Sequence, residues 1–135
     1  MTQDHTIRLA YINTLLDGGH TRLSDKTINP TEGYIVGGVT EPTTMNVPTL
    51  DFNDSRELDS YEQFKTLWQK YDLQLDEYTS NLYKAGMGVG TWVYEGKIYF
   101  DLVQHMYNLD VATDIAMKRG EIAIYDCKKQ KDILL

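Results

Sequence analysis

The sequence predicts an α+β domain, in which about three helices cover one small mixed sheet. Three observations indicate this class. Apolar residues recur at helical spacing in separate segments, two strand-like runs flank a tight turn at Glu95-Gly96, and a short helix followed by a strand ends the chain. A length of 135 residues suits a single domain over 1–135, large enough to bury one core.

The first helix is expected over residues 2–17. Its apolar side chains recur every three or four residues and should face the core, and they are Leu9, Ile12, Leu15 and Leu16. Gly18-Gly19 is placed to end the helix. The polar stretch 20–32 that follows lacks periodicity and predicts an ordered loop.

The second helix has the strongest signal in the chain. Ser60 and Gln63 fit a capping box, and helical spacing continues to about Tyr71. Residues up to Leu82 predict a further helix that starts after Asp72 or Asp76. Before them, Pro42 and Pro48 make 40–59 a surface loop with at most an edge strand at 47–52.

The C-terminal part predicts a ββαβ unit over 88–127. The two-residue turn pairs Trp92 with Tyr99 and sorts the hairpin into two faces. The core face comprises Val89, Thr91, Val93, Ile98, Phe100 and Leu102, and the other face comprises Trp92, Tyr94, Tyr99 and Asp101. Asp110 should cap a helix that ends at Lys118-Arg119. A right-handed crossover then makes the strand 121–127 parallel to the second hairpin strand and places it alongside the first.

Charge indicates the kind of partner. Twenty acidic and 13 basic side chains give a net charge of −7, which disfavours direct nucleic-acid binding and favours a basic protein. The acids concentrate in a loop and helix at 51–77, and the candidate partner-binding residues are Asp51, Asp54, Glu57, Asp59 and Glu62. The competing interpretation is a solvated loop and helix start, where acidic residues are favoured in any case.

Catalytic, metal and cofactor sites are not predicted. The three histidines and Cys127 lack the spacing of zinc ligands, and an enzyme that uses Cys127 with His105 ranks last among the hypotheses. The glycines of 86–90 precede a strand rather than open a helix, unlike a phosphate loop. A lone cysteine and the lack of an export signal or apolar span predict a cytoplasmic protein without membrane association.

An aromatic surface offers a second hypothesis. Trp92, Tyr99 and Tyr125 should share the sheet face opposite the core, where they would bind a small ligand or nucleotide. The glycine-rich strand expected at 33–39 would line the same pocket. In the simpler interpretation, which we favour, a helix covers these rings.

The glycine-rich strand, the hairpin and the last strand together resemble a known group of proteins. The matching runs are 33–38, 90–93, 96–103 and 119–126, with Ala116. They are similar to small proteins of phages, prophages and plasmids from Gram-positive bacteria and actinobacteria. This resemblance brings no catalytic residues, and it implies an inhibitor of a host function, including CRISPR nucleases or restriction enzymes. The leading hypothesis is therefore a non-enzymatic protein whose carboxylates occupy a basic channel in place of phosphates.

Overall fold

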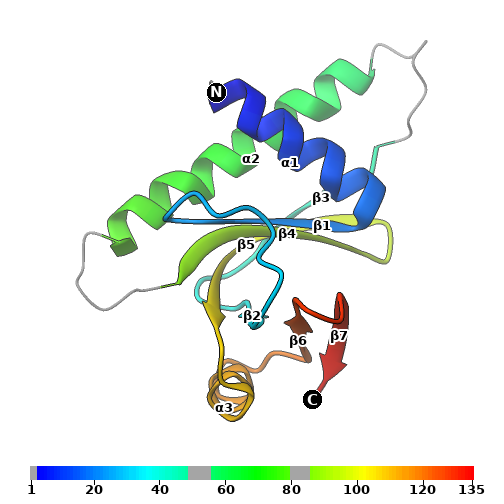
Figure 1. Cartoon of the computed structure of the whole chain (residues 1–135). Helices are drawn as coiled ribbons and strands as arrows, with labels where there is room; N and C mark the ends of the chain where they lie inside the picture. The colour runs from blue at the N-terminus through cyan, green and yellow to red at the C-terminus, as the bar shows by residue number, and fades with distance from the viewer. Residues whose placement is uncertain (1–2, 49–55, 80–85) are drawn as a thin grey trace.

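The computed structural model describes residues 3–48, 56–79 and 86–135, apart from the side chains of residues 56–58 and 79. In this part of the chain, three helices accompany one seven-stranded antiparallel sheet (Figure 1). The elements are α1 (Gln3–Asp17), β1 (Gly19–Leu23), β2 (Tyr34–Val36), β3 (Thr43–Asn46), α2 (Arg56–Thr79), β4 (Met87–Tyr94), β5 (Lys97–Met106), α3 (Leu109–Lys118), β6 (Ala123–Asp126) and β7 (Lys131–Leu134). The predicted α+β class is confirmed.

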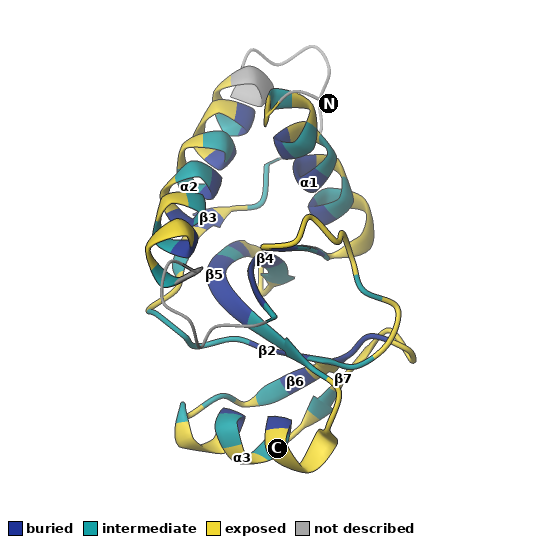
Figure 2. Ribbon diagram, turned by 60° about the vertical axis from the view of Figure 1, so that its left-hand side comes forward, coloured by how far each residue is buried: buried dark blue, intermediate teal, exposed yellow. Residues whose placement is uncertain are grey.

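The long strand β5 connects two parts of the molecule. The strand order is β1-β4-β5-β2-β6-β7, and β3 pairs with β5 beside β2. Helices α1 and α2 cover β1, β4 and β5 at one end, whereas α3 covers β2 and β6 at the other (Figures 1 and 2). We call these ends the helical lobe and the C-terminal lobe. None of the described helices is both long and apolar enough to cross a membrane.

The β4–β5 hairpin has the predicted register. Trp92 pairs with Tyr99 and Tyr94 pairs with Lys97 across the Glu95-Gly96 turn. Both turn residues have positive φ, as the two-residue turn requires. The predicted core face is turned toward α1 and α2, and all of its residues except the half-buried Val93 are buried.

The core of the helical lobe is formed mainly by the buried face of α2. The buried residues recur at intervals of three and four and are Tyr61, Phe64, Trp68, Tyr71 and Leu75. The helix begins at Arg56, four residues before the expected cap at Ser60, and continues to Thr79 without a break at Asp72. The predicted capping box and second helix are therefore wrong, because apolar spacing continues and no described residue inside the helix interrupts it.

Helix α1 forms as predicted but with a different buried face. The residues that face the core are Ile7, Ala10, Tyr11 and Thr14. Ile12 and Leu16 are exposed, contrary to the prediction. The inward face includes a threonine because Thr14 Oγ1 is satisfied by the carbonyl of Ala10 at 2.6 Å and by Thr91 Oγ1 at 2.6 Å.

The predicted ββαβ unit is only half correct. Strand β6 runs in the same direction as β5, because both are antiparallel to β2. However, β2 lies between them, and β1 occupies the position beside β4 that was assigned to the last strand. All pairs are antiparallel, so the sheet is not mixed. The cap of α3 is Asn108, whose side chain accepts a hydrogen bond from Val111 N, rather than Asp110.

Three further strands differ from the expectation. The stretch 20–32 was predicted as a loop, yet β1 covers its first residues. β7 was not predicted. β3, at Thr43–Asn46, precedes the edge strand expected at 47–52, of which residues 47 and 48 are not in a strand and 49–52 lie outside the described residues. The predicted strand at 33–39 is confirmed in its central part as β2.

Candidate functional site

The predicted acidic residues fall at the start of α2. Asp51 and Asp54 lie outside the described residues, and Glu57 belongs to α2 but its side chain is not described. Asp59 and Glu62 are exposed. Among the described residues, the candidate surface therefore lies on α2.

One face of α2 points away from the core and is rich in acidic side chains. Its residues recur at intervals of three and four, and we call it the acidic face: Asp59, Glu62, Thr66, Gln69, Leu73, Asp76 and Glu77. The exposed Lys70 lies at its edge, four residues after Thr66, and its Nζ donates to Thr43 Oγ1 at 3.1 Å. All residues of the acidic face are exposed except the half-buried Gln69, and Leu73 is 68% exposed. Exposed carboxylates therefore lie at both ends of the acidic face.

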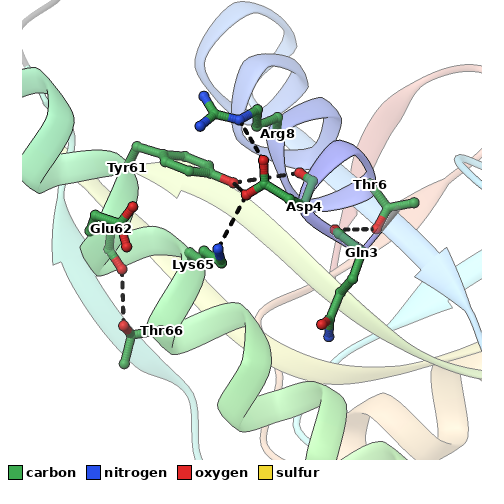
Figure 3. A network of polar contacts seen from close by, with 8 residues as sticks. All are labelled: Gln3, Asp4, Thr6, Arg8, Tyr61, Glu62, Lys65 and Thr66. Carbon is green, nitrogen blue, oxygen red and sulfur yellow. Dashed lines mark hydrogen bonds and ion pairs between the residues drawn. The ribbon is translucent and has the colours of Figure 1, made fainter. Parts of the chain in front are cut away.

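Lys65, on the side of α2 next to α1, forms an ion pair with Asp4 of that helix. Asp4 accepts hydrogen bonds from Arg8 Nε at 2.8 Å and from the Tyr61 hydroxyl at 2.7 Å, and Lys65 Nζ lies 3.2 Å from the same carboxylate (Figure 3). These donors, led by Arg8, hold the pKa of Asp4 well below its usual range. Burial and the bond to Asp4 raise the pKa of Tyr61 to about 12. Lys65 is thus directed toward α1, not across the acidic face.

A cleft of about 290 Å³ adjoins the acidic face between α1 and α2. Its lining combines two carboxylates, two carboxamides and one leucine, from Gln3, Gln69, Asp72, Leu73 and Asp76. Asp72 is paired with Arg22, which is largely buried. Side chains of this kind supply hydrogen-bond acceptors, so the cleft suits an ammonium or guanidinium group.

The predicted aromatic surface is formed only in part. Trp92 and Tyr99 stack on each other with centroids 5.2 Å apart and planes 7° apart, and both are half-buried. They lie on the sheet face away from α1 and α2, so the expectation that a helix covers them is wrong. Tyr125 pairs with Ile35, itself paired with His105, which puts it beside the far end of β5. Within the described residues, no ring contact joins it to Trp92 or Tyr99.

A buried carboxylate beside this surface was not singled out from the sequence. Asp101 is 1% exposed; its Oδ2 accepts a bond from Gly38 N at 2.6 Å, while Oδ1 has no partner among the described residues. Burial, with the nearby Glu121, raises its pKa to about 7. A side chain at Gly37 would collide with both carboxylates, since its Cβ would lie within 2.8 Å of each. Arg119 anchors the same corner through the Gly37 carbonyl at 3.2 Å.

A second cavity, of about 350 Å³, lies in the C-terminal lobe, and we call it the C-terminal pocket. Three segments distant in sequence meet there: the start of β2 with the residues before it, the connection from β5 to α3, and the β6–β7 hairpin. Its lining includes Tyr34, Tyr107, Lys128, Lys129 and Ile133. Apart from Tyr34, which belongs to the strand expected at 33–39, none of these residues was singled out from the sequence as a site, because only the fold brings the three segments together.

The sulfur and imidazole groups do not form an activated pair. Cys127 is buried against Ile35 and Val103, and burial raises the pKa of its thiol to about 11. His105 Nε2 instead donates to the carbonyl of Glu32 at 2.7 Å. A raised pKa opposes thiolate formation, the opposite of what a nucleophilic cysteine requires. Within the described residues, no group of three or more His, Cys, Asp or Glu is arranged to hold a metal ion.

Comparisons of the chain with protein families, with curated proteins and with solved structures find no match in any of the three. The acidic face and the C-terminal pocket therefore have to be interpreted from the chemistry of their own side chains.

Proposed function

We propose that this chain is a non-enzymatic interaction protein that binds a basic host protein through the acidic face of α2. The face belongs to a 24-residue helix, which extends for about 36 Å. That length is enough to follow an extended basic groove. The adjoining cleft would receive one arginine or lysine of the partner, and the exposed Leu73 would supply apolar contact beside it.

The observation that carries this proposal is the position of Asp76 and Glu77. Both lie in the last turn of α2, which contains no basic residue among those described. The negative end of the helix dipole lies there, so the dipole gives no reason for acidic side chains at these positions. At Asp59, in the first turn, the dipole favours an acid and a structural reason suffices. Two adjacent exposed carboxylates beside the cleft support a role in recognition.

The partner class we propose is a nucleic-acid-binding enzyme of the host, such as a defence nuclease. Such enzymes bind phosphates in basic channels, and carboxylates on a rigid helix present negative charge in the same way. The sequence resemblance to proteins of mobile elements supports this choice. Binding of this kind depends on long-range charge attraction and should weaken as salt is added.

The experiment uses charge reversal within the acidic face. A variant with Glu62→Lys and Asp76→Lys is immobilised beside the wild-type chain, and captured host proteins are compared at about 0.1 M and about 1 M salt, where the screening length falls from about 10 Å to about 3 Å. We expect basic proteins on the wild-type chain at low salt, at least tenfold less on the variant, and loss of both at high salt. A captured nuclease should then be inhibited by the wild-type chain only.

The matched control carries the same charge change elsewhere. Asp17→Lys with Asp132→Lys raises the net charge equally, at exposed positions outside α2. It should capture the same proteins as the wild type. If the control loses them as fully as the α2 variant, net charge alone is responsible, and the proposed face is wrong.

A further inference from the structure

The C-terminal pocket has the size and the chemistry of a small-molecule site. Its volume of about 350 Å³ falls in the range of roughly 300–1,000 Å³ that is usual for ligand pockets. Leu109 and Ile133 contribute apolar wall, and tyrosine, lysine and glutamate side chains surround it. Pockets with apolar walls and a few convergent polar groups are typical of ligand binding.

Two tyrosines supply aromatic surface. Tyr34 is half-buried, whereas Tyr107 is 75% exposed. The Tyr107 ring is held by an edge contact with His105, with centroids 4.8 Å apart and planes 75° apart. His105 is held in turn by its bond to the Glu32 carbonyl. A ring that is oriented but left largely in water is suited to stack on a planar ligand.

Two lysines supply positive charge in a turn of fixed shape. The side chain of Asp126, which is 6% exposed, accepts hydrogen bonds from Lys128 N at 3.0 Å and Lys129 N at 3.1 Å. This carboxylate is therefore engaged with the backbone of the turn. In the part of the chain that the structure describes, no ion pair joins either lysine ammonium group to a carboxylate. Both ammonium groups are available to an anion.

Glu32 adds a third kind of contact. It is exposed and lines the same pocket, and its backbone carbonyl is already bonded to His105. Its carboxylate can only accept hydrogen bonds. A ligand that offers an amine at one end of a planar ring system and negative charge at the other would satisfy all three groups.

We propose that the C-terminal pocket binds a mononucleotide whose base carries an exocyclic amine. The base stacks on Tyr107 and Tyr34, its amine donates to Glu32, and the phosphate contacts Lys128 and Lys129. The net charge of −7 repels long polyanions but acts little on one small anion beside two lysines, so a single nucleotide fits better than a nucleic-acid strand. This site lies in the C-terminal lobe, whereas the acidic face lies in the helical lobe. Nucleotide binding can therefore be tested independently of partner binding.

Calorimetric titration of the whole chain tests the proposal, with adenosine monophosphate as the probe. Adenosine, uridine monophosphate and inorganic phosphate form the comparison arms. Adenosine lacks the phosphate, uridine monophosphate lacks the exocyclic amine, and inorganic phosphate lacks both the base and the amine. We expect each to bind at least about tenfold more weakly, because stacking on one base or one charged contact is worth about that factor. An oligonucleotide that binds more tightly than the mononucleotide would overturn the assignment in favour of a strand.

Surface variants locate the site without endangering the fold. Tyr107→Ala and the pair Lys128→Ala with Lys129→Ala should each weaken binding about tenfold or more, and only the lysine variant should lose its salt dependence. Matched controls are Tyr94→Ala and Lys131→Ala, which remove the same exposed side chains outside the pocket. They should bind as the wild type does.

The outcomes are distinct. Binding that survives both pocket variants overturns the proposal, as does the absence of binding at millimolar nucleotide. Inorganic phosphate that binds as tightly as adenosine monophosphate would reduce the pocket to an anion site and overturn the role of the rings. A change in Trp92 fluorescence on binding would show that the ligand binds at the Trp92–Tyr99 surface, at the opposite end of β5, and would overturn the proposal.

Discussion

Asp101 is the residue whose surroundings most oppose its ordinary ionisation. Burial is the largest cause that raises the pKa of Asp101, and the negative charge of Glu121 raises it further. The hydrogen bond from Gly38 N and the charge of Arg119 lower this pKa but do not cancel the increase. The carboxyl titrates at about 7 in the folded chain instead of its ordinary 3.8. Between these two pH values the folded state keeps a proton that the unfolded state has lost. Stability therefore falls as pH rises through this window.

Replacing Asp101 with asparagine should remove that loss. Asparagine keeps an oxygen that can accept the bond from Gly38 N but carries no charge. We expect Asp101→Asn to match the wild type near pH 4 and to exceed it by about 4 kcal/mol above pH 7, as measured by urea unfolding. Equal stability at the higher pH would mean that the ionised carboxylate is accommodated without cost.

His20 has the opposite effect on the pH dependence of stability. Asp101→Asn must therefore be compared with the wild type at each pH. Burial lowers the pKa of this ring to about 4 from 6.5, and Asn13 Nδ2 donates to its Nδ1 at 3.1 Å. The unfolded state binds a proton here that the folded state does not. Stability thus rises with pH between these values. The difference between Asp101→Asn and the wild type cancels this contribution, because both chains keep His20.

At the scale of elements, the sequence predicts those that local chemistry decides. The β4–β5 hairpin is fixed by its two-residue turn and by alternation, so its register and faces were predictable. β1 was not predictable, because a strand containing His20, Thr21 and Arg22 exists only through pairing with β4. The C-terminal pocket could not be predicted for the same reason, since three segments distant in sequence form it.

The cap of α3 gives a test at this scale. The sequence pattern favoured Asp110, but the side chain that accepts Val111 N is that of Asn108, at 3.0 Å. Asn108→Ala should therefore cost about 1 kcal/mol of stability in urea unfolding, and Asn108→Asp should restore it. Asp110→Ala is the matched control, with an expected cost of about 0.3 kcal/mol from the helix dipole alone. Equal losses for the two alanine variants would contradict the assigned cap.

At the scale of the whole molecule, β5 is the strand that joins the two lobes in the described part of the chain. Its first residues pack with α2 in the core of the helical lobe, and its last residues pair with β2 beneath α3. The main apolar clusters of the two lobes are separate, with Phe64 and Phe100 in one and Val36 and Ile124 in the other. A third, small cluster holds Ile35, Val103 and Cys127. A continuous hydrogen-bonded sheet is thus what can couple the two lobes in unfolding.

We expect this coupling to make the domain unfold as one unit. Phe64 is fully buried, and its ring centroid lies 4.9 Å from that of Phe100. Phe64→Leu should therefore destabilise the helical lobe by about 1 to 2 kcal/mol. Native-state hydrogen exchange then reports on each lobe separately. If unfolding is cooperative, amide protection at Ile124 falls by the same factor as at Leu102, about tenfold for each 1.4 kcal/mol. Unchanged protection at Ile124 would show that the C-terminal lobe remains folded when the helical lobe opens, so that the C-terminal pocket could persist without the acidic face.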